Sequence, residues 1–419
     1  MRRRVSRIHE IYIDHATYFA AALVTFYVIA GVFYSQILSQ ELRFPDERLY
    51  VKIANNVSSL NLFSSNGEVP TAERAPAYAF LLSLFVRFEN GLIYARIMNF
   101  IFVGVSAFLC FKILCDFGHA LAGILSIFLL LFYPLVFFTA GTLYPQSLAT
   151  FLLVAISYLL LSGRYHTGYM VGTGLVYGIL LLVLPAFLAF LPVFGFMVYR
   201  SASGGRRGPL PALSVFLIAS ALVLAPWLYR NYDAFGQFVF VSTNSGLMLI
   251  KGNSENTRVN IGPRVDIARY RNIAEINSAN PAQYDGLLRK QAIQWIANNP
   301  NRAFVLYLKK FINWFNFSNK LATESEESVV RDIILFMTYY TILLLAVWNI
   351  LFDKSAQVRS LKIYIALLYL GAGAIYAVFF TRIRYRVPFD AMMIMLAALQ
   401  VEALAKRYLL EPKEMTARG

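Results

Sequence analysis

The chain has 419 residues, of which 58% are hydrophobic and only 15% are charged. A soluble domain is about 45–50% apolar and about 25% charged, so this composition excludes an ordinary soluble protein. The formal net charge of +15 would favour nucleic-acid binding in a soluble chain. In a membrane protein the excess is expected in cytoplasmic loops, so no nucleic-acid partner is expected here.

Apolar runs of about 20 residues recur along the chain, which is the length that a helix needs to cross about 30 Å of hydrocarbon. These unbroken runs lack the alternation of a membrane β-barrel, so the sequence predicts an all-α polytopic membrane protein. About ten spanning helices are expected. Their ranges are 16–37, 92–114, 120–138, 147–161, two within 168–199 that are separated at Pro185, 210–229, 332–351, 361–380 and 389–405.

Basic residues indicate how these spans are oriented. Arginines at positions 2, 3, 4 and 7 place the N-terminus in the cytoplasm under the positive-inside rule. No small-residue cleavage site follows the first apolar core, so we interpret this segment as a spanning helix and not as a removed signal peptide. We expect a multi-pass transmembrane domain, 1–407, in a cell (inner) membrane, followed by a cytoplasmic tail, 408–419. The loops 39–90 and 230–331 are then external or periplasmic.

The first external loop carries the clearest candidates for chemistry. Asp46 and Glu47 follow the first span, and Arg74 comes just before the chain turns apolar again. Each of these charges also has a structural explanation, since acidic residues favour a helix start and an arginine can extend from the membrane to water. Apolar residues at helical spacing predict an interfacial helix in this loop: Leu49, Ile53, Val57 and Leu60.

Further cations are expected on the same side. Arg230 and Lys251 fall in the long external loop, and three arginines fall in a short external loop where such residues are disfavoured: Arg382, Arg384 and Arg386. Binding an anion at the outer surface is one explanation, and contact with lipid headgroups is another. A carboxylate can accept the proton of an attacking hydroxyl, and arginines can neutralise a phosphate leaving group. The set therefore fits transfer from a lipid-phosphate donor.

The sequence leaves the use of a metal open. The histidines lie at predicted cytoplasmic positions or at the start of the first span, so a histidine metal site is not expected: His9, His15, His119 and His166. Asp46 and Glu47 are compatible with a divalent metal cofactor and equally with metal-free chemistry.

Several stretches, in order along the chain, resemble the C-type, polyprenyl-phosphate-dependent glycosyltransferases. The similarity is to the branch that holds protein O-mannosyltransferases and bacterial aminoarabinose transferases, and it covers roughly residues 40–400. The stretches are FPDERLYVKIANN, ERAPAYAFLLSLF, TLYPQSLATFLLVAISYLLL, PWLYRNYDAFGQFVFVSTNSGLMLIKGN, AIQWIANNPNRAFVLYLKKFINWF and RIRYRVPFDAMMIMLAA.

The resemblance implies a GT-C fold in which the first external loop forms the active site over a lipid-filled cavity. It implies that Asp46 is the base of a single inverting displacement and that Arg74 contacts the donor phosphate. The chain departs from the family in two respects. Leu184 precedes Pro185 where the family often has an arginine, and ten spans are fewer than many members have. Acceptor recognition is therefore expected to differ or to depend on a partner.

We hypothesise a membrane glycosyltransferase that moves a sugar from a polyprenyl-phosphate donor to a hydroxyl of an extracytoplasmic acceptor in the cell envelope. Asp46 is the expected base, and Glu47 is expected to orient or assist it. The donor phosphate is expected to bind Arg74, Arg230, Lys251, Arg384 and Arg386, with Tyr50, Tyr78 and Tyr385 lining the site. One alternative is a transporter or flippase of lipid-linked sugars, which should place charges near the middle of its spans. The other is a non-catalytic scaffold of an envelope complex.

Overall fold

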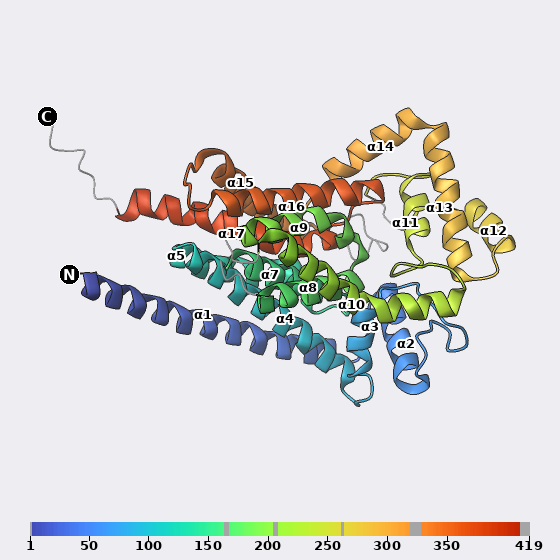
Figure 1. Cartoon of the computed structure of the whole chain (residues 1–419), viewed down its shortest axis with the longest axis horizontal. Coiled ribbons are helices and arrows are strands. Elements are labelled where there is room, and N and C mark those ends of the chain that lie inside the picture. Colours follow the sequence, from blue (N-terminus) through green and yellow to red (C-terminus); the bar gives the residue numbers. More distant parts are fainter. Residues whose placement is uncertain (1, 163–166, 204–207, 261–263, 319–327, 411–419) are drawn as a thin grey trace.

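The computed structural model describes residues 2–162, 167–203, 208–260, 264–318 and 328–410. Within these ranges the secondary structure is helical and no strand is present, which confirms the predicted all-α class. His166, residues 319–327 of the long loop and residues 411–419 of the expected tail lie outside them. Figure 1 shows an elongated bundle in which the beginning of α1 (Arg2–Leu38) and the end of α17 (Ile383–Ala405) lie at the same end.

The predicted spans correspond to apolar helices of the bundle. In the described part of the chain, seven helices are long and apolar enough to cross a membrane. Besides α1 and α17 these are α4 (Gly91–Asp116), η1 with α9 (Pro185–Phe190 and Leu191–Ala202), α10 (Pro209–Phe235), α15 (Val329–Phe352) and α16 (Arg359–Val378). Two shorter apolar helices, α7 (Gln146–Leu161) and α8 (Thr167–Val183), match the predicted spans at 147–161 and before Pro185. The chain is therefore a multi-pass membrane protein.

The span predicted over 120–138 is bent. It consists of α5 (Ala120–Leu131) and α6 (Pro134–Ala140), whose axes differ by 60°. Proline has no N–H for the helical hydrogen bond and its ring clashes with the preceding turn, so a helix does not run straight through Pro134. The same residue suits the first position of the new helix. If the bent pair forms one span, the described part of the chain has up to eight spans by length and composition.

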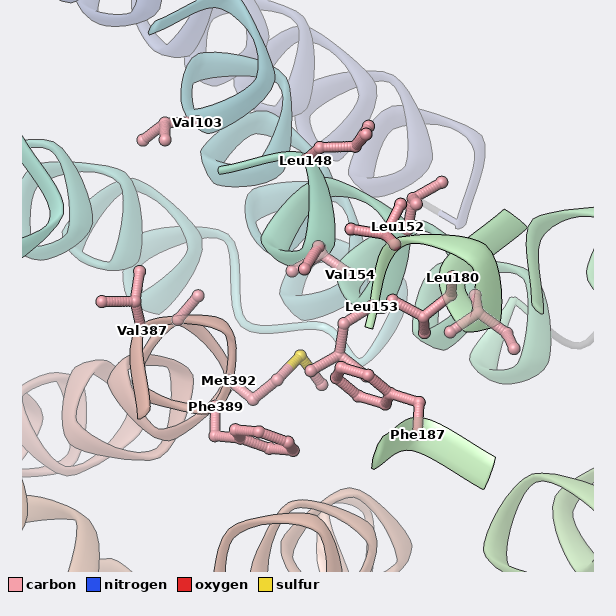
Figure 2. Packing of buried hydrophobic residues seen from close by; sticks show 14 of the residues in the cluster. Val103, Leu148, Leu152, Leu153, Val154, Leu180, Phe187, Val387, Phe389 and Met392 are labelled. Atoms are coloured by element: carbon pink, nitrogen blue, oxygen red, sulfur yellow. The ribbon is translucent and has the colours of Figure 1, made fainter. Parts of the chain in front are cut away.

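Helix α17 lies at the centre of the bundle. Of its most apolar segment 83% is buried, against 22% for α1. Figure 2 shows Phe389 and Met392 of α17 directed toward Leu153 of α7 and Phe187 of η1. The rings of Phe187 and Phe389 stack with centroids 5.4 Å apart. Because α17 begins at Ile383 and not at the predicted residue 389, the arginines expected in a loop belong to the start of this helix or directly precede it.

The helices of the two predicted external loops gather at the end of the bundle opposite the beginning of α1 (Figure 1). The first loop contains α2 (Pro45–Leu60), as its helical spacing predicts, and α3 (Pro76–Ser83). The long loop contains α11 (Ser245–Gly252), α12 (Ala268–Ile276), α13 (Pro281–Asn298) and α14 (Pro300–Asn313). The chain thus brings both loops together at one end of the bundle, and the first turn of α17, which carries arginines, starts at the same end.

A buried lysine joins the second of these loops to the bundle. The ammonium of Lys310 in α14 donates to the carbonyl oxygens of Gly252 and Phe379, both at 2.9 Å. Gly252 packs so closely that a Cβ there would come within 1.8 Å of the Phe379 oxygen. The end of α11 is therefore fixed against the segment between α16 and α17.

Candidate active site

The start of α2 is built to hold two adjacent carboxylates in different positions. Pro45 occupies the first helical turn with Asp46 and Glu47, where acidic side chains suit the helix N-terminus. Glu47 is fully buried, and its Oε2 accepts from the backbone N–H groups of Arg43 and Phe44 at 2.9 and 3.0 Å. Its Oε1 accepts from the N–H of Leu143 at 2.8 Å. Glu47 thereby ties α2 to the segment between α6 and α7, which is a positioning role.

Asp46 is held between two arginines from distant parts of the chain. Its Oδ1 lies 2.9 Å from Nη2 of Arg74, which precedes α3, and its Oδ2 lies 2.6 Å from Nη2 of Arg384, in the first turn of α17. The Asp46 side chain retains 30% exposure, so it is accessible from solvent. Three of the residues singled out in the sequence are thus in direct contact.

The two arginines determine the charge state of Asp46. Burial alone would raise the pKa of Asp46, but the neighbouring Arg384 and Arg74 outweigh it and lower that pKa to about 2. Burial likewise favours a lower pKa for Arg74, yet Tyr50 and Asp46 leave the pKa of Arg74 raised. Asp46 is therefore ionised at neutral pH, and it accepts a proton weakly while both guanidinium groups are bound to it.

Aromatic rings surround this ion-pair group. The guanidinium of Arg384 lies over the rings of Tyr144 and Tyr385, 4.6 and 5.4 Å from their centroids. Tyr50 is buried and packs edge-on against Tyr78, with centroids 5.4 Å apart. Burial is the main cause that raises the pKa of Tyr50 and that of Tyr144, each to about 12, so both hydroxyls are neutral at physiological pH.

The predicted tyrosines therefore take different places. Tyr50 and Tyr385 adjoin the charged group, whereas Tyr78 lies behind Tyr50 and is hydrogen-bonded to Asn99, whose Nδ2 donates to its hydroxyl at 3.1 Å. Sequence reasoning missed Tyr144. The signal that could have found it was its place in a short external turn between two apolar segments, since such turns reach the same side as the charged loops.

Two further cations act on Asp46 without binding it. Lys251 in α11 is only 8% exposed. Burial, together with the charges of Arg271 and Arg74, lowers the pKa of Lys251, while Asp46 raises it. Arg382 is half-buried; burial is the main cause that lowers the pKa of Arg382, and the positive charge of Arg384 lowers it further. The prediction that Lys251 belongs to this region is consistent with these interactions.

Arg230 is engaged elsewhere. Its Nη1 donates to the carbonyl oxygen of Thr71 at 2.8 Å and its Nη2 to that of Phe63 at 3.0 Å. The guanidinium also lies 4.8 Å from the centroid of the Trp227 ring. These contacts hold the first external loop against α10, so both terminal nitrogens of Arg230 are occupied by the protein.

Arg386 lies in the core, which disagrees with its expected role at the donor phosphate. Its Nε is 3.0 Å from Asp390, its Nη1 donates to two backbone carbonyls, and its guanidinium lies over the Tyr339 ring. Successive helical residues are about 100° apart, so residues two positions apart face different sides. Arg384 therefore faces the external end while Arg386 faces the interior.

The Arg386–Asp390 pair also bears on the transporter alternative. Charges inside a span are a sign of a transport pathway. Here both side chains are fully buried, and Asp390 additionally accepts from the hydroxyls of Tyr133 and Tyr369 at 3.3 and 3.2 Å. Nη2 of Arg386 has no hydrogen-bond partner among the described residues, but the other contacts of the pair are made within the core, which is typical of a structural anchor. Sequence reasoning did not single out Asp390, which falls at the start of the span predicted over 389–405.

These residues do not fit a divalent metal. Hard cations take about six oxygen ligands, whereas both oxygens of Asp46 are bound by arginines and those of Glu47 by backbone N–H groups. Among the residues that the structure describes, no group of three or more His, Cys, Asp or Glu side chains is arranged to hold a metal. The positive charges around Asp46 would also repel a cation.

An apolar groove lies at the bend between α5 and α6. It has a volume of about 300 Å³ and is lined by Tyr34, Leu131, Phe132, Pro134, Phe137 and Phe138. Phe138 packs against Phe44, and Phe44 packs against Tyr144, with centroids 6.2 and 6.0 Å apart. Since Tyr144 lies under Arg384, these rings connect the groove to the ion-pair group.

Comparisons with known proteins bear on the fold. No family model and no curated protein matches the chain. The apo oligosaccharyltransferase of Archaeoglobus fulgidus superposes with a TM-score of 0.52 at 14% identity, over 94% of this chain and 51% of that protein. The same enzyme tethered to an acceptor peptide gives 0.51 at 13% identity, over 93% and 50%. The chain thus spans about half the length of the archaeal enzyme.

ArnT of Cupriavidus metallidurans bound to undecaprenyl phosphate is also similar, at 15% identity over 92% of this chain and 79% of that protein. Its TM-score of 0.43 is too low to add to the argument. At these identities the likeness concerns the fold, and it confirms the GT-C fold that the sequence resemblance implies.

Proposed function

We propose that the chain is a membrane glycosyltransferase that moves a sugar from a polyprenyl-phosphate donor to a hydroxyl of an extracytoplasmic acceptor. The observation that carries this proposal is the ionised Asp46 between Arg74 and Arg384, at the end of the bundle where the non-spanning helices gather. A carboxylate that can take a proton and guanidinium groups that can take a phosphate are the two functions that such a transfer requires.

The donor would enter with its polyprenyl tail in the apolar groove at the bend between α5 and α6. The aromatic contacts from Phe138 through Phe44 to Tyr144 support this route, because they lead from the groove to Arg384. The donor phosphate then binds Arg74 and Arg384 in place of the Asp46 carboxylate. A phosphate bound to these arginines neutralises the charges that lower the pKa of Asp46. It also releases the carboxylate oxygens of Asp46 from their ion pairs.

The transfer itself would be a single displacement. Asp46 accepts the proton of the acceptor hydroxyl while the hydroxyl oxygen forms a bond to the anomeric carbon. The bond between that carbon and the phosphate oxygen breaks, and the electron pair leaves on the phosphate. Arg74 and Arg384 stabilise the charge of the leaving group, so no separate acid is required. Attack opposite the leaving group inverts the anomeric configuration.

The site would face the external or periplasmic side. The arginines at positions 2, 3, 4 and 7 favour a cytoplasmic start of α1, and the proposed site lies at the other end of the bundle.

The test is an Asp46→Asn variant, assayed for sugar transfer from a panel of synthetic polyprenyl-phosphate sugars. We expect transfer to fall by about 100-fold or more, since removal of a general base typically costs a factor of 10²–10⁴. Glu68→Gln is the matched control, because Glu68 is an exposed carboxylate in the same loop. Full activity of Asp46→Asn would overturn the assignment of the base.

A further inference from the structure

Helix α14 carries an exposed apolar face that the proposed transfer does not use. Phe304, Leu308 and Ile312 follow one another at intervals of four residues, and Val305 lies beside them, so all four share one side of the helix. The exposed fractions of Phe304, Leu308 and Ile312 are 62, 42 and 70%, and that of Val305 is 47%. A contiguous exposed apolar face indicates contact with an apolar partner.

The opposite face of α14 is fixed to the protein. It carries Ala303, Leu306 and Lys310, none of which is more than 9% exposed. Lys310 donates to the backbone oxygens of Gly252 and Phe379, so this face is bound to the end of α11 and to the segment after α16. Helical positions three, four and seven apart lie on one side, and the exposed apolar residues therefore point away from the protein.

The last turn of α14 packs on a membrane-spanning helix. The ring of Trp314 stacks on that of Tyr376, with centroids 5.6 Å apart. A Cβ at Gly373 would come within 3.0 Å of Trp314 and 3.2 Å of Phe311. Tyr376 and Gly373 belong to α16, which ends at Val378. Gly373 lies five residues before this end, which is about 8 Å along the helix axis.

This position determines what surrounds the exposed face. The 20 residues of α16 extend over about 30 Å, the thickness of the hydrocarbon layer, so a contact about 8 Å from its end lies within that layer. Ile312 stands between Phe311 and Trp314 in the chain but is exposed, so it meets lipid at this depth. Lys309 is exposed beside the apolar face, where an ammonium reaches lipid headgroups.

We infer that the apolar face of α14 lies among the acyl chains of the leaflet on the side of the candidate active site. Figure 1 shows α14 leading obliquely from the end of α13 back toward α16, which is the course of a helix at a membrane surface. Membrane lipid is thus the partner of this face. The inference concerns the position of the protein in the membrane, whatever reaction the site performs.

The same helix is bonded to the segment that leads to the active site. The hydroxyl of Thr381 donates to the backbone oxygen of Lys310 at 3.0 Å and accepts from Nδ2 of Asn313 at 2.9 Å. Thr381 is three residues before Arg384, which binds Asp46. The contact of α14 with lipid would therefore fix the depth at which the active site lies relative to the leaflet.

The experiment places single nitroxide labels on the full-length protein in phosphatidylcholine nanodiscs. Phe304→Cys, Leu308→Cys and Ile312→Cys are made in a chain that carries Cys110→Ala and Cys115→Ala, which removes the free native thiols. Collisions of each label with molecular oxygen, which concentrates in hydrocarbon, are compared with collisions with a water-soluble nickel chelate. Oxygen should prevail at all three positions, and the ratio of oxygen to chelate collisions should be largest at Ile312 and fall toward Phe304.

Ile276→Cys is the matched control. Ile276 is an apolar residue that is 83% exposed, and it lies in α12, which packs against α13 in the long loop. The chelate should prevail there, so the comparison separates contact with lipid from exposure of an apolar side chain. Thermal unfolding identifies any variant that fails to fold, and Val305→Cys then provides another label on the same face.

The inference is wrong if the chelate prevails at both Leu308 and Ile312. Exclusion of both reagents from these labels would overturn it too, because the face would then be covered by protein, and dipolar broadening between labels would identify a second copy of the chain. No sugar or donor takes part in these measurements. Their outcome is therefore separate from that of the Asp46→Asn assay, which tests the proposed function.

Discussion

The Asp46 carboxylate and the Arg384 guanidinium lie 2.6 Å apart, although 338 positions separate them in the chain. Asp46 lies in the first turn of α2 in the external loop, and Arg384 lies in the first turn of α17, the central helix of the bundle. Arg74 binds the second oxygen of the same carboxylate. The contact therefore closes the loop onto the bundle and, while it is made, restrains the residue that we propose as the base.

Replacing Arg74 or Arg384 by Met should weaken use of the donor. Each change removes charge-assisted hydrogen bonds to the phosphate, so we expect kcat/KM for the donor to fall about 10- to 100-fold. Steady-state kinetics against donor concentration measure this effect. Arg48→Met is the matched control, because Arg48 is exposed on the same helix as Asp46. Unchanged kcat/KM in both variants would contradict the phosphate role.

Replacing Arg386 by Met should affect stability and not donor binding. Arg386 and Asp390 are fully buried, and removal of one partner of a buried ion pair costs about 3–5 kcal/mol. We expect a clear drop in the unfolding temperature, with largely restored stability in the double variant Arg386→Met/Asp390→Asn, which carries no unpaired charge. Arg359→Met, at an exposed site in α16, is the control. A stable Arg386→Met variant with impaired donor affinity would support the original expectation instead.

The contrast between Arg384 and Arg386 shows what the sequence could predict. Hydropathy located the spans because a bilayer requires long apolar helices whatever their partners. The RIRYR stretch was recognisable as charged, but the sequence analysis assigned it to a loop. In the structure it belongs to a helix, and the helical geometry directs Arg384 and Arg386 to different sides. That geometry depends on α17 starting at Ile383, which follows from packing against the rest of the bundle. Local composition carries no such information.

The same limit applies to the neighbouring acids. Asp46 and Glu47 are adjacent residues with the same charge, so the sequence alone assigned both of them to the site. Only the position of Leu143, far along the chain, reveals that Glu47 binds backbone N–H groups in the interior. The pairing of Asp46 with Arg74 was easier to anticipate, because both residues lie in one loop.

Replacing Glu47 by Gln should therefore destabilise the external loop. A glutamine side chain has a single oxygen, so at least one of the N–H groups of Arg43, Phe44 and Leu143 loses its partner. An unpaired buried donor costs about 1–3 kcal/mol, which thermal unfolding would detect relative to Glu89→Gln, an exposed control. Normal stability combined with a large loss of kcat would instead indicate that Glu47 takes part in proton transfer.

Donor binding should change the pH dependence of transfer. In the free protein, Arg384 and Arg74 lower the pKa of Asp46 from its ordinary value of 3.8 to about 2 against the effect of burial. A lowered carboxyl pKa stabilises the folded protein above about pH 4, and this contribution is lost as the pH falls toward 2. When a donor phosphate occupies the arginines, the pKa of Asp46 should rise.

The acid limb of kcat reports the enzyme with bound substrate, and that of kcat/KM reports the free enzyme. We therefore expect the acid limb of kcat to lie at a higher pH than that of kcat/KM. In the Arg384→Met variant, one of the two charges that keep Asp46 ionised is gone. The acid limb of kcat/KM should therefore move to higher pH, toward the acid limb of kcat. Arg48→Met should leave both limbs in place. Coincident limbs in the wild type would mean that the phosphate does not displace Asp46 from its arginines.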